Sequence, residues 1–171
     1  WDTPYGIPPF SEISVDDYIP AIQAGIDQQT KEIDAIVADT AAPTFANTIE
    51  PLERSGSILA KVQGVLFNIH ETDRTDALDS IVNLALPMLT EHGDNISFNK
   101  GLYERVAKVY HADQTALTRE QQMVLKKHFE SFERSGIGLP DDKQERLRQI
   151  NADLAVMQQK VSTNILPENN D

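Results

Sequence analysis

Residues 147–165, LRQINADLAVMQQKVSTNI, decide the fold class of this chain. Their large apolar side chains recur three or four positions apart, at Leu147, Ile150, Leu154, Met157, Val161 and Ile165. This spacing follows the 3.6-residue turn of an α-helix, so it places all six side chains on one face. Asp141 and Asp142 follow Pro140 and suit a first helical turn, where carboxylates meet free N–H groups. The segment is therefore predicted to be a long amphipathic helix.

Similar apolar spacings, separated by Pro and Gly, recur through the rest of the chain. No comparable run alternates with period two, so the fold class is all-α, with about seven helices. Six helices are expected before the last one: from near Asp16 to the break at 41–44, over Phe45–Ser55, Ile58–Ile69 and Leu78–Leu89, over Lys100–Tyr110, and from Thr118 to Ser135. His70–Thr75 is predicted to be a turn, and Pro87 is predicted to kink or break its helix.

Local signals indicate where several helices begin and end. Thr44 is expected to cap the helix that follows it, and Thr118-Arg119-Glu120-Gln121 fits a capping box. Glu-Arg-Ser-Gly occurs twice, ending at Gly56 and at Gly136. We interpret both copies as helix ends, with Arg near the negative end of the helix dipole and Gly in a left-handed conformation, and not as a repeat unit.

The chain divides into a short arm and one helical domain. Residues 1–13 contain Pro4, Gly6, Pro8 and Pro9 and are predicted to form an extended arm that its apolar side chains hold against the surface. Residues 14–171 form the helical domain.

Composition excludes several functions. Among 171 residues, 27 acidic and 15 basic side chains give a formal net charge of −12, which disfavours nucleic-acid and membrane-surface partners. No apolar stretch approaches the length of about 20 residues that spans a bilayer. Because the chain has no cysteine, it has no disulfide, thiolate nucleophile or Cys-based zinc site.

No catalytic, cofactor-binding or metal-binding residue is predicted in the chain. Its four histidines are His70, His92, His111 and His128. A helical zinc peptidase site needs His-Glu-x-x-His, and His70-Glu71 begins that pattern, but Arg74 stands where the second histidine is required. Ser55 and Ser57 are not part of a Gly-x-Ser-x-Gly elbow, and Gly136-Ile137-Gly138 lacks the third glycine of a phosphate loop.

Several sequence blocks resemble a family of peptidases. Residues 42–49, APTFANTI, and 52–56, LERSG, resemble a stretch near the N-terminus of bacterial peptidyl-dipeptidases, in the thimet oligopeptidase and neurolysin superfamily of zinc metallopeptidases. Further blocks follow in the same order: YIPAI at 18–22, EIDAI at 32–36, LYERV at 102–106, FERSG at 132–136 and LRQIN at 147–151. Each block alone is weak, but their collinearity covers essentially the whole chain. The spacing resembles the dipeptidyl-releasing branch more than the oligopeptidase A branch.

The resemblance implies a much longer enzyme that removes dipeptides from the C-termini of short, unstructured peptides. Its zinc ligands, on a His-Glu-x-x-His helix and a further helix downstream, would lie in a C-terminal catalytic domain beyond Asp171. This chain would form an N-terminal wall or lid of the substrate channel, without zinc or catalysis of its own. Such a continuation would also cover the apolar stripe of the last helix.

Two further expectations concern the chain as a unit. Trp1-Asp2-Thr3 is not a translational start, which favours a processed, periplasmic protein over a cytoplasmic one. The alternative to the peptidase segment is a free-standing helical module that binds a peptide or a partner helix in a groove.

Overall fold

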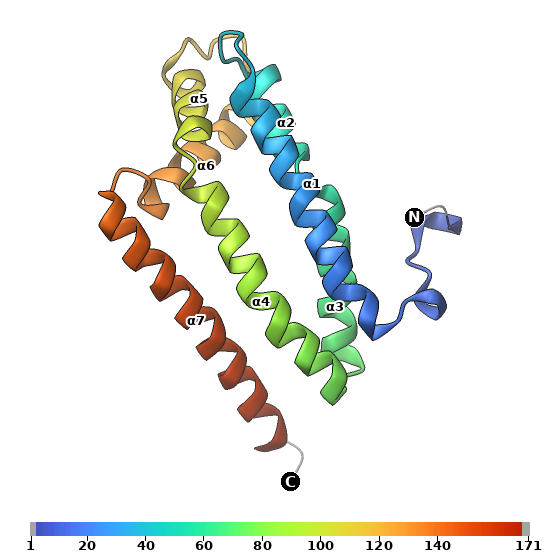
Figure 1. Cartoon of the computed structure of the whole chain (residues 1–171). Coiled ribbons are helices and arrows are strands. Elements are labelled where there is room, and N and C mark those ends of the chain that lie inside the picture. Colours follow the sequence, from blue (N-terminus) through green and yellow to red (C-terminus); the bar gives the residue numbers. More distant parts are fainter. Residues whose placement is uncertain (1–2, 169–171) are drawn as a thin grey trace.

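The computed structural model describes residues 3–168, and these residues form an all-helical structure without strands (Figure 1). Its α-helices are α1 (Tyr18–Ala38), α2 (Glu50–Arg54), α3 (Ser57–Thr72), α4 (Asp76–Ser97), α5 (Lys100–His111), α6 (Arg119–Ser135) and α7 (Asp141–Glu168). Three single turns of 3-10 helix, at Pro4–Gly6, Phe10–Glu12 and Val15–Asp17, precede α1, and a π-helical turn, Phe45–Ile49, precedes α2. The prediction of an all-α fold is confirmed. None of the described helices is long and apolar enough to cross a membrane.

The predicted caps form at their predicted places. Thr44 Oγ1 accepts the backbone N–H of Asn47 over 3.2 Å. At the start of α6, Thr118 and Gln121 satisfy each other's backbone N–H groups, over 3.3 and 3.0 Å. These bonds supply partners for N–H groups that have none inside the helix.

Both Glu-Arg-Ser-Gly segments end a helix, as predicted. Gly56, after α2, has φ 71°, and Gly136, after α6, has φ 85°. These left-handed conformations disfavour residues that carry a Cβ, which explains why glycine stands at both positions.

Two apolar cores lie along the length of α1. One core joins α1, α3 and α4 and contains Ile22, Leu66 and Val82. The other joins the end of α1 with the 45–54 segment, the end of α4, α5 and α6, and it contains Ile49, Leu102 and Leu125. The helices of the first core form the long bundle of Figure 1, and those of the second core meet at the end where α5 and α6 lie.

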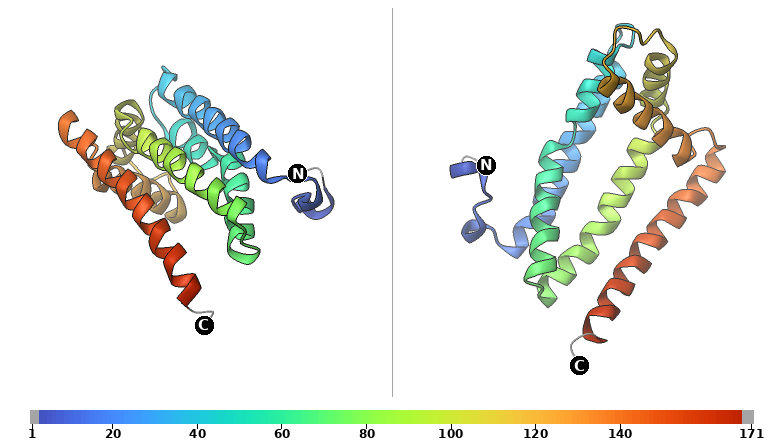
Figure 2. Two further views of the ribbon diagram at one scale, coloured as in Figure 1. Left: turned by 60° about the horizontal axis from the view of Figure 1, so that its bottom comes forward. Right: turned by 180° about the vertical axis from the view of Figure 1, so that it is seen from behind.

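Helix α7 lies at the edge of the molecule and packs mainly along α4 (Figures 1 and 2). Both pictures place α1 and α3 on the other side of α4. One long side of α7 therefore has no neighbour among the described residues.

Two local predictions are corrected by the structure. Of the kink or break predicted at Pro87, the break does not occur, because helix α4 runs through Pro87. Pro87 has no N–H to donate to the carbonyl of Asn83, one turn earlier. Because both residues are exposed, this carbonyl lies on the side of the helix that is open to water. Helix α3 continues to Thr72, so His70 lies in its last turn and not in a loop.

The segment before α1 is less extended than predicted. Two of its short 3-10 helices, Pro4–Gly6 and Phe10–Glu12, fall within residues 1–13. Phe10 and Pro8 lie near Lys61 and Val65 of α3, around a hollow of about 570 Å³, but Tyr5 is 99% exposed. The apolar side chains therefore hold only part of this segment against the bundle.

Candidate interaction surface

The structure places His70 in a cluster with Asp79 and Arg74. His70 Nε2 lies 2.7 Å from Asp79 Oδ1, and Arg74 donates to both oxygens of Asp79 over 2.7 and 3.1 Å. The bonds from Arg74, and then those from His70, lower the pKa of Asp79. Asp79 thus joins the end of α3 to the start of α4, and Arg74, which interrupts the zinc motif, is one of its two partners.

His92 belongs to a partly buried chain of polar side chains between α1, α4 and the end of α2. Its Nε2 lies 2.9 Å from Gln29 Oε1, and Gln29 Nε2 donates to Ser55 Oγ over 3.3 Å. Ser55 Oγ in turn donates to the Leu52 carbonyl over 2.8 Å. Because Gln29 Oε1 only accepts, His92 Nε2 carries the proton. Burial lowers the pKa of His92.

The other two histidines lie near the second core. His128 Nε2 is 2.5 Å from Glu53 Oε1 and joins α6 to α2. The His111 ring packs edge-on against Phe129, with ring centroids 5.3 Å apart. Among the described residues, no three His, Cys, Asp or Glu side chains come together in a way that could hold a metal ion.

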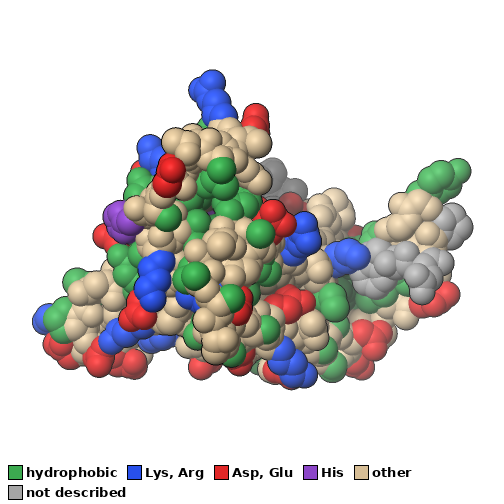
Figure 3. Space-filling model, turned by 90° about the horizontal axis from the view of Figure 1, so that it is seen from above, with side chains coloured by type: hydrophobic (Ala, Val, Ile, Leu, Met, Phe, Trp, Pro, Cys, Tyr) green, Lys and Arg blue, Asp and Glu red, His purple; other side chains and the backbone are tan. Residues whose placement is uncertain are grey.

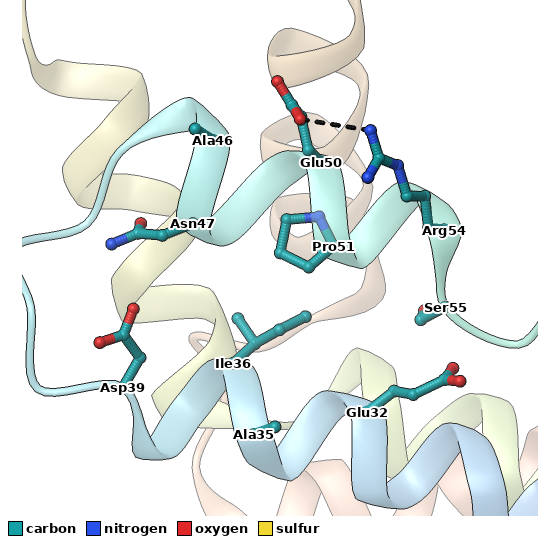
Figure 4. Close-up of a pocket in the computed structure, with 10 residues that line it drawn as sticks. All are labelled: Glu32, Ala35, Ile36, Asp39, Ala46, Asn47, Glu50, Pro51, Arg54 and Ser55. Atoms are coloured by element: carbon teal, nitrogen blue, oxygen red, sulfur yellow. Dashed lines mark hydrogen bonds and ion pairs between the residues drawn. The ribbon is translucent and has the colours of Figure 1, made fainter.

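A groove of about 460 Å³ separates α1 from the 45–55 segment (Figure 4). Ile36 and Pro51 form part of its apolar lining, and its charged lining is acidic on balance, with three carboxylates, those of Glu32, Asp39 and Glu50, and one cation, Arg54. These carboxylates already have partners: Glu32 accepts the Gly56 N–H over 2.8 Å, Asp39 pairs with Arg105 and Glu50 with Arg54. The groove has a defined shape, but no buried charge in it lacks a partner.

Helix α7 faces α4 with small and polar side chains. Asn151 donates to Asp94 over 2.8 Å, and Arg148 donates to Asn95 over 3.0 Å. The Arg148 guanidinium also lies 4.7 Å from the centre of the Phe98 ring. The half-buried residues of α7 along this contact are Arg148, Asn151, Ala152, Ala155 and Gln159. Polar contacts and small side chains therefore make the α4–α7 contact along most of its length.

The apolar stripe of α7 points away from α4. Only Leu147, at its start, packs against the second core, close to Gly136. The next four members are between 38% and 60% exposed: Ile150, Leu154, Met157 and Val161. Ile165, the last predicted member, lies outside the residues whose side chains are described. Four large apolar side chains in register on one open helix face are the strongest sign of a missing partner in the described chain.

Charges of both signs are mixed over the described surface seen in Figure 3, without a continuous basic area. With a net charge of −12 on the chain, this face offers no footprint for a phosphate backbone. The interaction surface best supported by the geometry is therefore the apolar stripe of α7.

Comparison with known proteins defines the class. No protein-family model matches the chain. Oligopeptidase A of Escherichia coli strain K12 is 27% identical over 96% of the chain. Dipeptidyl carboxypeptidase of Salmonella typhimurium is 30% identical over 95% of the chain, and the E. coli protein of that name is 28% identical over 97%. The chain spans about a quarter (24%) of the length of each.

The chain is therefore a homologue of the N-terminal part of peptidases. Oligopeptidase A and dipeptidyl carboxypeptidase are members of the thimet oligopeptidase family. The resemblance of the sequence blocks to this family is therefore confirmed. Oligopeptidase A and dipeptidyl carboxypeptidase match at similar identity, so assignment to the dipeptidyl-releasing branch remains a prediction.

Proposed function

We propose that this chain is the N-terminal channel-wall or lid segment of a zinc peptidase that releases dipeptides from the C-termini of short peptides. The observation that carries the proposal is the match of at least 95% of the chain to the N-terminal part of both kinds of peptidase. The zinc and the residues that activate water would be held by the remainder of the polypeptide.

The side-chain chemistry of the segment is compatible with a supporting role. His70, His92 and His128 each contact a polar side chain of another helix, and His111 packs against an aromatic ring. These histidines therefore stabilise the helix packing. A rigid helical wall contributes to peptidase action by limiting the size of the substrate that enters and by excluding water around it.

A deletion in the longer protein tests this role. Removal of residues 1–171 should leave the zinc content, measured by mass spectrometry of the dialysed protein, near one ion per chain. Dipeptide release from short peptides should fall strongly, because the peptide is positioned less well while the metal chemistry remains. Unchanged release by the truncated protein would refute the wall or lid role.

The groove of Figure 4 favours a second candidate, a free-standing module that binds peptides. Its acidic lining would select basic peptides. Calorimetric titration of the 171-residue chain with a library of basic peptides distinguishes the two functions. Micromolar binding that is lost in Glu50→Gln, together with the absence of peptidase activity in the longer protein, would favour the module.

A further inference from the structure

We propose that the exposed stripe of α7 is the docking face for an amphipathic helix from the remainder of the same polypeptide. The exposed part of the stripe consists of Ile150, Leu154, Met157 and Val161. This inference rests on the proposed function, because it requires a longer chain. Beyond the proposed function, it identifies the surface through which this segment contacts the rest of the longer chain, and it specifies a helix as the element that covers that surface.

The spacing of the stripe fits a helix as its partner. Its steps of four, three and four residues average about 3.7 residues, close to one helical turn, so its side chains form a nearly straight line, as at the contact of two helices that pack side by side at a small crossing angle. From Ile150 to Val161 the stripe is roughly 17 Å long at 1.5 Å per residue, which is about three turns of a partner helix. The stripe is also narrow, and a second helix covers a narrow straight line of side chains more fully than an irregular loop does.

The polar contacts with α4 explain why the stripe stays outward. Asn151 and Arg148 bind Asp94 and Asn95, and these bonds fix the rotation of α7 about its own axis. A rotation that turned Leu154 and Met157 toward α4 would break both bonds and leave the buried Asp94 without the hydrogen bond from Asn151. Within this chain, the stripe therefore cannot be covered by rotation of α7.

The size of the stripe favours a tethered partner. The exposed area of its four partly covered side chains is on the order of 400 Å², about half of the area that each partner buries in a standard protein–protein interface. Self-association through this stripe alone would be weak, and two copies of a chain with net charge −12 also repel each other. A partner on the same polypeptide needs less area, because the connection supplies a high effective concentration. The matched relatives are about four times as long as this chain, which leaves ample sequence for such a helix.

Cysteine labelling tests the proposal, because the chain has no cysteine of its own. Met157→Cys probes the stripe, and Lys160→Cys is the matched control on the exposed polar side of the same turn. Each variant is prepared in the 171-residue chain and in the longer protein, and peptide mapping after a brief reaction with a maleimide gives the rate at that position. Near-ultraviolet and far-ultraviolet circular dichroism verify that the variants are folded.

We expect both positions to react at similar rates in the 171-residue chain. In the longer protein, Met157→Cys should react at least about tenfold more slowly, since labelling then requires the partner helix to open, while Lys160→Cys should change by less than about twofold. Equal rates for Met157→Cys in the two proteins would overturn the proposal. So would protection that grows with the concentration of the 171-residue chain, which indicates a second copy, or protection that requires an added short peptide, which indicates the substrate channel.

Dipeptide release by the same preparations separates this inference from the proposed function. An active longer protein in which Met157→Cys stays reactive would refute the docking helix and leave the peptidase assignment standing. A protected Met157→Cys in a protein without peptidase activity would refute the assignment and support the docking surface.

Discussion

Asn151 of α7 donates a hydrogen bond from its side-chain amide to Asp94 Oδ1 of α4 over 2.8 Å, between residues 57 positions apart in the sequence. The Asp94 side chain is buried, so it depends on this bond in place of water. Because the bond fixes which face of α7 meets α4, it also decides that the apolar stripe of α7 faces outward.

Replacing Asn151 with Ala should therefore destabilise the chain by about 1–3 kcal/mol, since a buried carboxylate loses a donor. Urea unfolding followed by circular dichroism measures the change. Gln149→Ala is the control: Gln149 bonds to Asp153 on the exposed side of α7, and its loss should cost less than about 0.5 kcal/mol. Equal effects of the two substitutions would contradict the role of Asn151.

Two helical glycines should respond to alanine in opposite directions. A Cβ on Gly25 of α1 would lie 2.9 Å from the Leu59 Cα of α3, so Gly25→Ala must push the two helices apart and should destabilise by about 1–3 kcal/mol. Gly64 of α3 has nothing within 4 Å of such a Cβ, so Gly64→Ala should stabilise by about 0.5–1 kcal/mol through helix propensity. Thermal unfolding of both variants is the measurement, and a stabilising Gly25→Ala would show that α1 and α3 are less tightly packed than described.

His92 should make the fold sensitive to mild acid. Burial lowers its pKa in the folded chain, so the unfolded chain binds the proton more readily than the folded one. The free energy of unfolding should be highest above the unfolded pKa of about 6.5 and should decrease as the pH falls from there toward the folded pKa. Replacement by glutamine, His92→Gln, should reduce this slope. Proton NMR titration of the ring checks the cause directly, and a His92 pKa above about 6.5 would refute it.

The 171-residue chain should not retain zinc after dialysis. His70 Nε2 is engaged by Asp79, and Arg74 bonds to the same carboxylate, so a metal ion at His70 would have to displace an ion-pair cluster next to a cation. Elemental analysis of the dialysed chain should give far less than one zinc per chain. Stoichiometric zinc that is lost in His70→Ala would contradict this prediction.

The ion pair between Asp79 and Arg74, at the start of α4, should make the stability of the fold depend on pH in the acid range. Hydrogen bonds from Arg74, and then from His70, lower the pKa of Asp79, so its contribution to stability is present above its ordinary pKa of about 3.9. That contribution is lost as the pH falls through the lowered pKa. Asp79→Asn should therefore destabilise the chain at pH 7, and this effect should shrink as the pH falls below about 3.9, which acid titration of the unfolding free energy would reveal. A substitution effect that does not change with pH would contradict the ionic role of Asp79.

Much of the local structure could be predicted because its causes are local. Thr44 and Thr118 act on N–H groups three residues away, Gly56 and Gly136 relieve a conflict within their own backbone, and the spacing of Leu102, Val106 and Val109 follows the turn of one helix. Collinear sequence blocks likewise carried the family resemblance, because homologous segments keep their order along the chain.

The surroundings of each helix were decided by the tertiary structure. The sequence by itself determined that α7 has an apolar face, because periodicity is a property of one segment. Only the folded chain decided that this face is open, because the bonds from Asn151 and Arg148 to α4 join residues more than 50 positions apart. Continuity of α4 through Pro87 was decided in the same way, since a proline is tolerated where the carbonyl that it leaves free lies on the exposed side of a packed helix.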